Sequence, residues 1–235
     1  MKRRITTAIM MVPVVFFLSL PVYSVESTAP ATETEQWIKV KEGQGIVSYG
    51  KPGSKNPVKT VYAVGIVNAS VPVIESLLRD VESHNRYVHM VSEGKKIELP
   101  DRKNSTDFFY EYCRLGMPWP AWDRDAVGSA QFLYNKATGE LNVIIRGVKA
   151  DDFKPNPKTI RMPVTNLSFK LVPKGPNETE VTYAIEADPA IALAPFILDM
   201  LFKTLSYNTI KNMREMVKQE KYSTATRVIT TTPGK

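Results

Sequence analysis

The sequence has a single cysteine and only two histidines among its 235 residues. One cysteine, Cys113, excludes an internal disulfide, so the fold must be held together by its core even in an oxidising compartment. A lone thiol in an apolar strand is typical of a small core residue. The histidines, His84 and His89, share one short segment, which argues against a zinc site. We therefore expect no metal and no cofactor.

Catalytic motifs are also missing. The chain contains no Ser-His-Asp set, metal-ligand cluster or phosphate-binding glycine loop, so we expect a protein that is not an enzyme. Its net charge of +7 falls to +4 without the three basic residues Lys2, Arg3 and Arg4. The remaining basic residues are scattered among Asp and Glu. This pattern argues against nucleic-acid binding and leaves open a transient contact with an anionic membrane surface.

The N-terminus has the parts of a secretory signal peptide, predicted to span residues 1–24. A basic start at Lys2–Arg4 precedes the nearly apolar run Ile5–Leu20, and Val22 and Ser24 suit the positions before a cleavage site at Val25. The alternative is an uncleaved anchor, because the apolar run approaches the length that spans a bilayer. We expect cleavage and export, with the bacterial periplasm as the destination.

The rest of the chain divides into three stretches. Residues 25–35 are rich in Ser, Thr, Pro and Glu and are expected to form a flexible leader. Residues 223–235 are mostly Thr, Ser, Gly and Pro and are expected to be a disordered tail. Residues 36–222 suffice for one domain with a substantial core, and they contain no repeat and no linker. We expect this domain to be a monomer.

The periodicity of the apolar residues predicts an α+β domain. A hairpin and a strand come first, then two short helices, six strands joined by short turns, and one long amphipathic helix. Short connections imply an antiparallel meander, and the last helix is needed to cover the concave face of the curved sheet. This helix-grip arrangement leaves space between sheet and helix. The predicted ranges are 37–49, 58–67, 71–81, 83–90, 91–99, 106–115, 125–134, 141–148, 159–172, 178–186 and 195–222.

Four local motifs resemble those of a known family. They are Gly45–Tyr49, Leu78–Glu82 before Tyr87, Met117–Pro120 before Arg124-Asp125, and Tyr183–Pro189 before Pro195. With this order and spacing, the chain is similar to the START (StAR-related lipid-transfer) domain, within the bacterial START-like group related to polyketide cyclases. The resemblance covers 37–222, although Ala190–Ala194 stands where many relatives have glycines. It implies a tunnel for one lipid-sized molecule, carried or sensed without reaction.

Three segments supply seven of the eleven candidate contacts to such a ligand, and two predicted strands supply the others. The loop 115–123 carries two indoles and a methionine, which suits a lid over the ligand or a contact with a membrane interface; the alternative is that Trp119 plugs the end of the core. A second loop, 149–158, brings Phe153. Bulky residues of the last helix suit a pocket roof, although any covering helix shows an apolar stripe. The candidates are Tyr110, Tyr112, Arg114, Met117, Trp119, Trp122, Phe153, Arg161, Phe196, Met200 and Tyr207.

The strand 106–115 has two candidate inward faces, because successive side chains in a strand alternate. If Tyr110, Tyr112 and Arg114 point inward, they suit a polar headgroup. If Glu111 and Cys113 point inward, Glu111 needs a buried cationic partner, for which Arg161 is the candidate. Arg124 and Asp125 are adjacent in a strand and so face opposite sides, which prevents joint action on one substrate.

Two other functions remain open at this stage. A cyclase or aromatase would use a titratable group in the cavity, for which Glu111, Asp125 and Tyr112 are candidates. Export argues against it, because such substrates are built on cytoplasmic carriers. A non-transporting interaction module would instead have a filled core.

Overall fold

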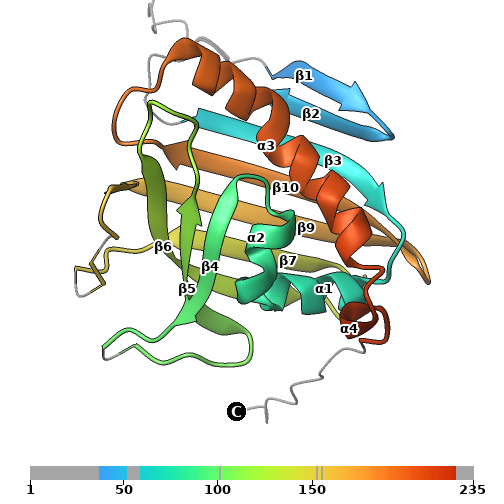
Figure 1. Ribbon diagram of the computed structural model, residues 1–235. Helices are drawn as coiled ribbons and strands as arrows, with labels where there is room; N and C mark the ends of the chain where they lie inside the picture. The colour runs from blue at the N-terminus through green and yellow to red at the C-terminus, as the bar shows by residue number, and fades with distance from the viewer. Residues whose placement is uncertain (1–36, 52–58, 101, 152, 155, 226–235) are drawn as a thin grey trace, which may run out of the picture. The chain divides into compact units, whose positions relative to one another are not determined.

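The computed structural model describes residues 37–51, 59–100, 102–151, 153–154 and 156–225, all within one compact unit (Figure 1). The predicted signal peptide and leader lie outside the described residues. The same holds for positions 226–235 of the predicted tail. Within the described part, the last helix ends at Ser223.

A single large antiparallel sheet forms the body of the domain. Its strands lie in the order β1-β2-β3-β10-β9-β7-β6-β5-β4, so that the consecutive strands from β4 onward form the predicted meander and β10 closes back on β3 (Figure 1). Short turns between strands of alternating character account for this order. The strands are β1 (Ile38–Gly43), β2 (Ile46–Gly50), β3 (Lys59–Val67), β4 (Val91–Ile97), β5 (Phe108–Leu115), β6 (Asp123–Tyr134), β7 (Leu141–Gly147), β9 (Val164–Gly175) and β10 (Glu178–Asp188).

The single strand predicted over 159–172 is wrong. The chain instead forms a short strand β8 (Thr159–Arg161), which pairs in parallel with β6, and then turns into β9. Pro163 lies at the break. Because proline has no backbone N–H to donate, it interrupts a ladder of sheet hydrogen bonds.

Helices cover the concave face of the sheet. After Ser70 at the N-cap position, Pro72 lies in the first turn of α1 (Val71–Arg79), followed by the turn η1 (Val81–Ser83) and the short α2 (His84–Tyr87). The long α3 (Pro195–Met216) crosses the sheet over β3 and contacts β1, β2 and β10 as well (Figure 1). The helix predicted over 195–222 therefore forms as two helices: α3 ends at Met216, and a separate short helix, α4 (Glu220–Ser223), follows. The helix-grip fold class is confirmed.

Apolar packing occurs on both faces of part of the sheet. The main core lies between the concave face and the helices and includes buried residues of α1, of the central strands and of α3. A second, smaller core lies on the opposite face of β4, β5 and β6, beneath the segment that follows β7. It consists of Ile97, Leu99, Tyr112, Val127 and Ala150, with Tyr110, Val148 and Phe153 packed against it.

Candidate ligand-binding cavity

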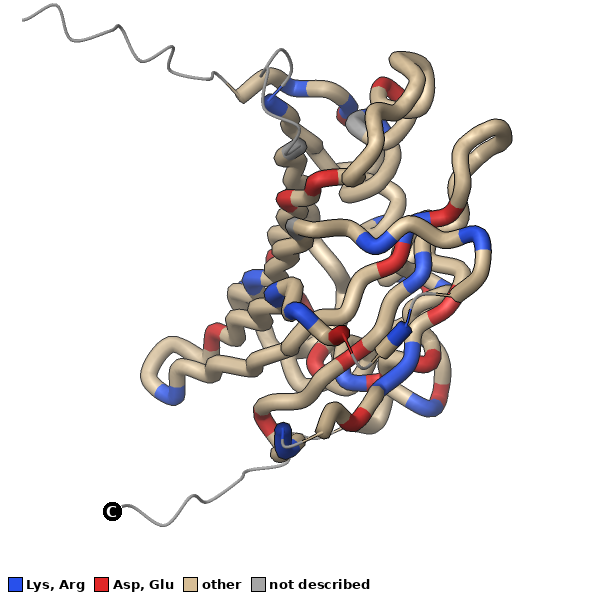
Figure 2. Tube along the Cα trace, turned by 90° about the vertical axis from the view of Figure 1, so that its left-hand side faces the viewer, with Lys and Arg blue, Asp and Glu red and all other residues tan. Residues whose placement is uncertain are grey.

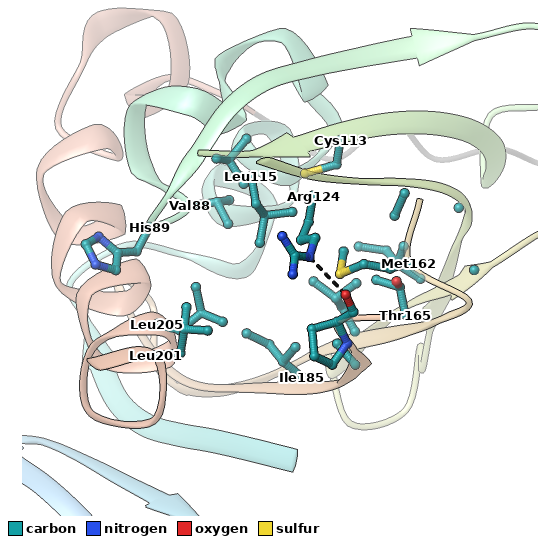
Figure 3. A pocket seen from close by; sticks show the side chains of 18 of the residues that line it. Val88, His89, Cys113, Leu115, Arg124, Met162, Thr165, Ile185, Leu201 and Leu205 are labelled. Atoms are coloured by element: carbon teal, nitrogen blue, oxygen red, sulfur yellow. Dashed lines mark hydrogen bonds between the residues drawn. The ribbon is translucent and has the colours of Figure 1, made fainter. Parts of the chain in front are cut away.

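An apolar cavity lies between the sheet and α3 (Figure 3). Its volume is about 130 Å³, on a measure by which one water molecule needs about 10–15 Å³. Strands β5, β6, β7, β9 and β10 supply one side, and Leu198, Leu201 and Leu205 of α3 supply the other. Further lining residues are Val88, His89, Val91, Met117, Ala126, Ile145, Met162, Leu167, Ile185, Ala187 and Leu193. The space is large enough for a small hydrophobic ligand.

The inward face of β5 carries Glu111, Cys113 and Leu115, which all line the cavity. Glu111 is only 6 % exposed. Burial raises its pKa to about 7, an effect that the charge of Lys96 partly offsets. No described residue hydrogen-bonds or forms an ion pair with the Glu111 carboxyl. Burial also raises the pKa of the Cys113 thiol, which makes it a poor nucleophile.

Arg124 is the basic group of the cavity wall and is 2 % exposed. Its Nε donates to the carbonyl of Pro189 at 2.9 Å (Figure 3). Its Nη1 donates to Trp122 O at 2.5 Å and its Nη2 to Ile191 O at 3.3 Å. Burial lowers its pKa. One guanidinium therefore joins the loop before β6 to the loop between β10 and α3. Two of its five N–H donors remain for other partners.

The two cavity histidines are held by backbone and amide groups. The Nε2 of His84 lies 3.1 Å from Leu78 O, and the Nε2 of His89 lies 3.3 Å from Asn208 Nδ2. Burial lowers the pKa of both imidazoles. In the part of the chain that the structure describes, no three His, Cys, Asp or Glu residues are grouped to hold a metal ion.

No family model matches the chain. An uncharacterized protein of Pseudomonas aeruginosa is 29% identical over 199 residues, which cover 84% of this chain and 93% of that protein. Among solved structures, the STAR-related lipid transfer protein of Xanthomonas axonopodis superposes with a TM-score of 0.66 at 21% identity, covering 78% of this chain and 99% of the other. Human StAR-related lipid transfer protein 5 gives 0.65 at 16% identity, covering 80% and 88%.

The chain has the START fold. The expectation that the four sequence motifs raised is thereby confirmed at the level of the fold. Within this START fold, the cavity occupies the space between the sheet and the long C-terminal helix, the position that the helix-grip arrangement leaves open.

The tyrosine face of β5 points away from the START cavity. Tyr112 packs in the second core with a ring-centroid distance of 5.1 Å to Phe153, and its hydroxyl accepts a hydrogen bond from Asn156. Burial raises the pKa of Tyr112 to about 12. Tyr110 joins the same core, and Arg114 pairs with Asp123 at 2.7 Å. None of these three residues lines the cavity.

Arg161 does not neutralise Glu111. Its Nε lies 2.7 Å from Oδ1 of the fully buried Asp125, and its Nη2 donates to Phe153 O at 3.2 Å. Arg124 and Asp125 do face opposite sides of β6, as predicted, because only Arg124 lines the cavity. Arg161 and Phe153 therefore support the outer loop and its small core.

The loop 115–123 places one of its three candidates at the cavity. Met117 lines it, whereas Trp119 is 89 % exposed and Trp122 is 60 % exposed. Trp119 therefore does not plug the end of the core.

The candidates on α3 also lie outside the cavity lining. Phe196 is 61 % exposed, and Met200 is partly buried beside the cavity but does not line it. Tyr207 is buried in the main core under Lys41, whose Nζ lies 4.2 Å from the ring centroid. The helix presents Leu198, Leu201 and Leu205 to the cavity instead.

Sequence reasoning missed several cavity residues, most of them small or aliphatic, such as Ala126, Met162 and Thr165. Glu111 and Cys113 were named as the alternative face of β5 but were not chosen. The alternation of side chains along β5 identifies its two faces, but the sequence does not show which of these faces the helices cover.

Proposed function

We propose that this protein binds one lipid or other hydrophobic small molecule in the apolar cavity and carries or senses it without chemical change. The observation that carries the proposal is the cavity itself, lined by aliphatic side chains of the sheet and of α3. The lipid-transfer proteins that share the fold support it. We further propose that this takes place after export, in the periplasm.

Burial of a hydrocarbon chain provides the driving force. Each methylene removed from water contributes about 0.8 kcal/mol, and association and ordering costs remove a large part of the total. An apolar cavity therefore suffices for affinity, and a few polar groups suffice for selectivity. Arg124, with two N–H donors to spare, is suited to an anionic or carbonyl-bearing group.

A binding role is favoured over a cyclase-type reaction by the state of the ionisable groups. The Arg124 guanidinium already donates to three carbonyls, and Asp125 and Tyr112 face away from the cavity. Glu111 has no base or nucleophile hydrogen-bonded to it among the described residues. A general acid–base reaction needs such groups in mutual contact.

We also propose that the protein meets a membrane surface with its two loops at the Arg124 end of the cavity. Trp119 and Trp122 lie on the loop before β6, Ile191 lies on the loop after β10, and Phe196 lies in the first turn of α3 that this second loop enters; all four side chains are exposed. Exposed indoles are favoured at the boundary between water and lipid. Basic and acidic residues are interspersed along the described chain, so the contact relies on these apolar side chains (Figure 2). In residues 37–225, outside the gaps, no helix is long and apolar enough to span a bilayer.

Native mass spectrometry of the protein purified from its host without detergent tests ligand binding. A stoichiometric hydrophobic adduct is expected. Ala126→Phe, which fills the cavity, should remove it, and Leu133→Asp, on an exposed position of β6, should retain it. A clean ligand-free mass that persists after incubation with host lipid extract would contradict the proposal.

A further inference from the structure

A pair of stacked aromatic rings lies in the cavity wall at the end away from Arg124. Phe169 of β9 and Tyr183 of β10 are directly paired, with ring centroids 4.2 Å apart and an angle of 12° between the ring planes. Both residues line the cavity, and they are only 4 % and 1 % exposed. Stacked rings attract each other beyond the effect of their burial, which holds the pair in a fixed position.

Strand register shows that this pair marks the inner end of the cavity. The row next to it on the side of Arg124 lines the cavity throughout and consists of Val61, Ile185, Leu167 and Ile145. The paired residues on the other side, Leu171 and Val181, are fully buried in the main core and are not part of the cavity lining. The open space therefore stops at Phe169 and Tyr183.

Helix α3 sets the same limit from the opposite side. Its lining residues are Leu198, Leu201 and Leu205. Five residues further along the helix, Ile210 packs directly on β3, because a Cβ on Gly65 would lie 3.2 Å from Ile210 Cγ2. Helix and sheet are thus in contact beyond Leu205, and no room for a ligand is left between them.

The volume of the cavity matches one hydrocarbon chain. At about 10–15 Å³ for each water, its 130 Å³ hold about ten water molecules, which fill about 300 Å³ in the liquid. A methylene group takes about as much space as a water molecule, so the cavity accommodates roughly ten to twelve carbons. From Tyr183 to Pro189 the wall extends over six residues, or about 20 Å, which is long enough for such a chain. A phospholipid with two 16-carbon chains would need roughly three times the volume.

We propose that the cavity binds a lipid with one hydrocarbon chain of about twelve carbons, and that Phe169 and Tyr183 limit the length of this chain. The chain lies between the sheet and α3 with its methyl end against the two rings. Carbons beyond about the twelfth remain in water at the Arg124 end and add no affinity. This assignment rests on the proposed function and specifies the class of ligand.

A series of single-chain probes tests the limit. Linear saturated fatty acids of 8 to 18 carbons, and the matching linear alcohols, compete in equimolar mixtures for the delipidated full chain, and native mass spectrometry separates the complexes by mass. For wild type, affinity should rise by up to about fourfold per carbon and stop rising near twelve carbons. Both series should stop at the same length, because the wall and not the end group sets it. Phosphatidylethanolamine with two 16-carbon chains should give no one-to-one complex.

Two variants should move the limit in opposite directions. Phe169→Ala removes a ring from the cavity wall and should extend the rise by about three carbons, whereas Ala126→Leu adds three side-chain carbons and should shorten it by about as much. Phe132→Ala is the matched control, because it removes the same ring from the main core at a position that does not line the cavity. It should leave the limit unchanged. Thermal melts of each variant show that it is folded.

The outcomes separate this assignment from the proposed function. A wild-type affinity that keeps rising to 18 carbons, or a limit that neither Phe169→Ala nor Ala126→Leu moves, would show that the two rings do not set the length. A one-to-one complex with the two-chain lipid would overturn the single-chain class, while hydrophobic binding would stand. If no probe and no component of a host lipid extract binds, the proposed function fails together with the length limit.

Discussion

Glu111 and Arg124 are both buried in the cavity wall, but they differ in how many hydrogen bonds their neighbours make to them. Arg124 donates to three backbone carbonyls. Glu111 has only the charge of Lys96 to offset its desolvation. A buried charge is tolerated when hydrogen bonds replace water, and it is otherwise neutralised through a shifted pKa. Arg124 therefore stabilises the folded protein through its hydrogen bonds, whereas an ionised Glu111 lowers the stability of the folded protein at high pH.

Replacing Glu111 by Gln should reveal this pH dependence. The folded-state pKa of about 7 exceeds the ordinary 4.5, so the native state holds the proton more tightly than the unfolded state. The penalty is absent below about pH 4.5 and complete above pH 7, where it amounts to about 3 kcal/mol. In urea unfolding of lipid-free protein, Glu111→Gln should be more stable than wild type at pH 8 and equal to it at pH 4.

Other titratable groups face Glu111, and the test requires that they do not themselves change protonation state between pH 4 and pH 8. These are Lys96 of β4, Cys113 of β5, Tyr87 of α2 and Tyr183 of β10. Burial raises the pKa of Tyr87, Cys113 and Tyr183, which keeps them neutral between pH 4 and pH 8. The same stability difference at both pH values would contradict the assignment to Glu111.

Arg124→Gln should destabilise the protein and loosen the two loops that the guanidinium joins. The change leaves the carbonyls of Trp122, Pro189 and Ile191 without this donor, a loss of about 2–4 kcal/mol for buried acceptors. Urea unfolding measures the loss, and limited proteolysis should show faster cutting between β10 and α3. Arg146→Gln, at an exposed position of β7, is the control, and an equal effect of both changes would count against the role of Arg124.

At the scale of elements, β5 shows what the alternation of side chains along a strand can and cannot predict. The alternation correctly divides the residues of β5 into two faces, but both faces carry aromatic or apolar residues. The reason is that β5 is covered on both faces: the cavity and helices lie on one side and the second core lies on the other. An apolar residue therefore does not indicate which side faces the cavity, so the sequence left the inward face open, and the candidates Tyr110, Tyr112 and Arg114 came from the face that points away from the cavity.

The two exposed loops at the Arg124 end of the cavity should govern attachment to lipid bilayers. Trp119→Ala combined with Trp122→Ala should lower binding to phosphatidylglycerol-containing vesicles about tenfold, because two interfacial anchors are lost. Stability should change by less than about 0.5 kcal/mol, since both indoles are exposed. Vesicle flotation measures binding, and Leu133→Ala, another exposed apolar side chain, serves as the control. Unchanged flotation of the double variant would exclude this face.

For the whole molecule, ligand binding and stability are linked. A ligand that binds only the folded state at 100 times its Kd adds about 2.7 kcal/mol. Delipidated protein should therefore melt at a lower temperature than protein carrying its ligand, and readdition of the lipid extract should restore the difference. Leu201→Asp, which places a charge on the face of α3 toward the cavity, should remove the response. A melting temperature that is insensitive to lipid in wild type would argue for a ligand-free interaction module.

The sequence by itself determined the kind and order of the elements, apart from β8 and the separate helix α4. The apolar periods of strands and helices are local, and so are the turn residues between them, such as the Asn135–Gly139 and Pro173–Asn177 segments. These patterns, together with the four motifs, were enough for the helix-grip fold. Boundaries shifted where a local breaker acted, as at Pro163.

Only the tertiary structure decided which residues form the site. Strand register brings Val61, Ile145, Leu167 and Ile185 into one row, although they are far apart in sequence. Ion pairing was decided in the same way, since Arg161 lies beside Asp125 of the neighbouring β6 and on the face opposite Glu111. Strand register, and which face of a strand the helices and loops cover, depend on several segments packed together, so no single stretch of sequence encodes them.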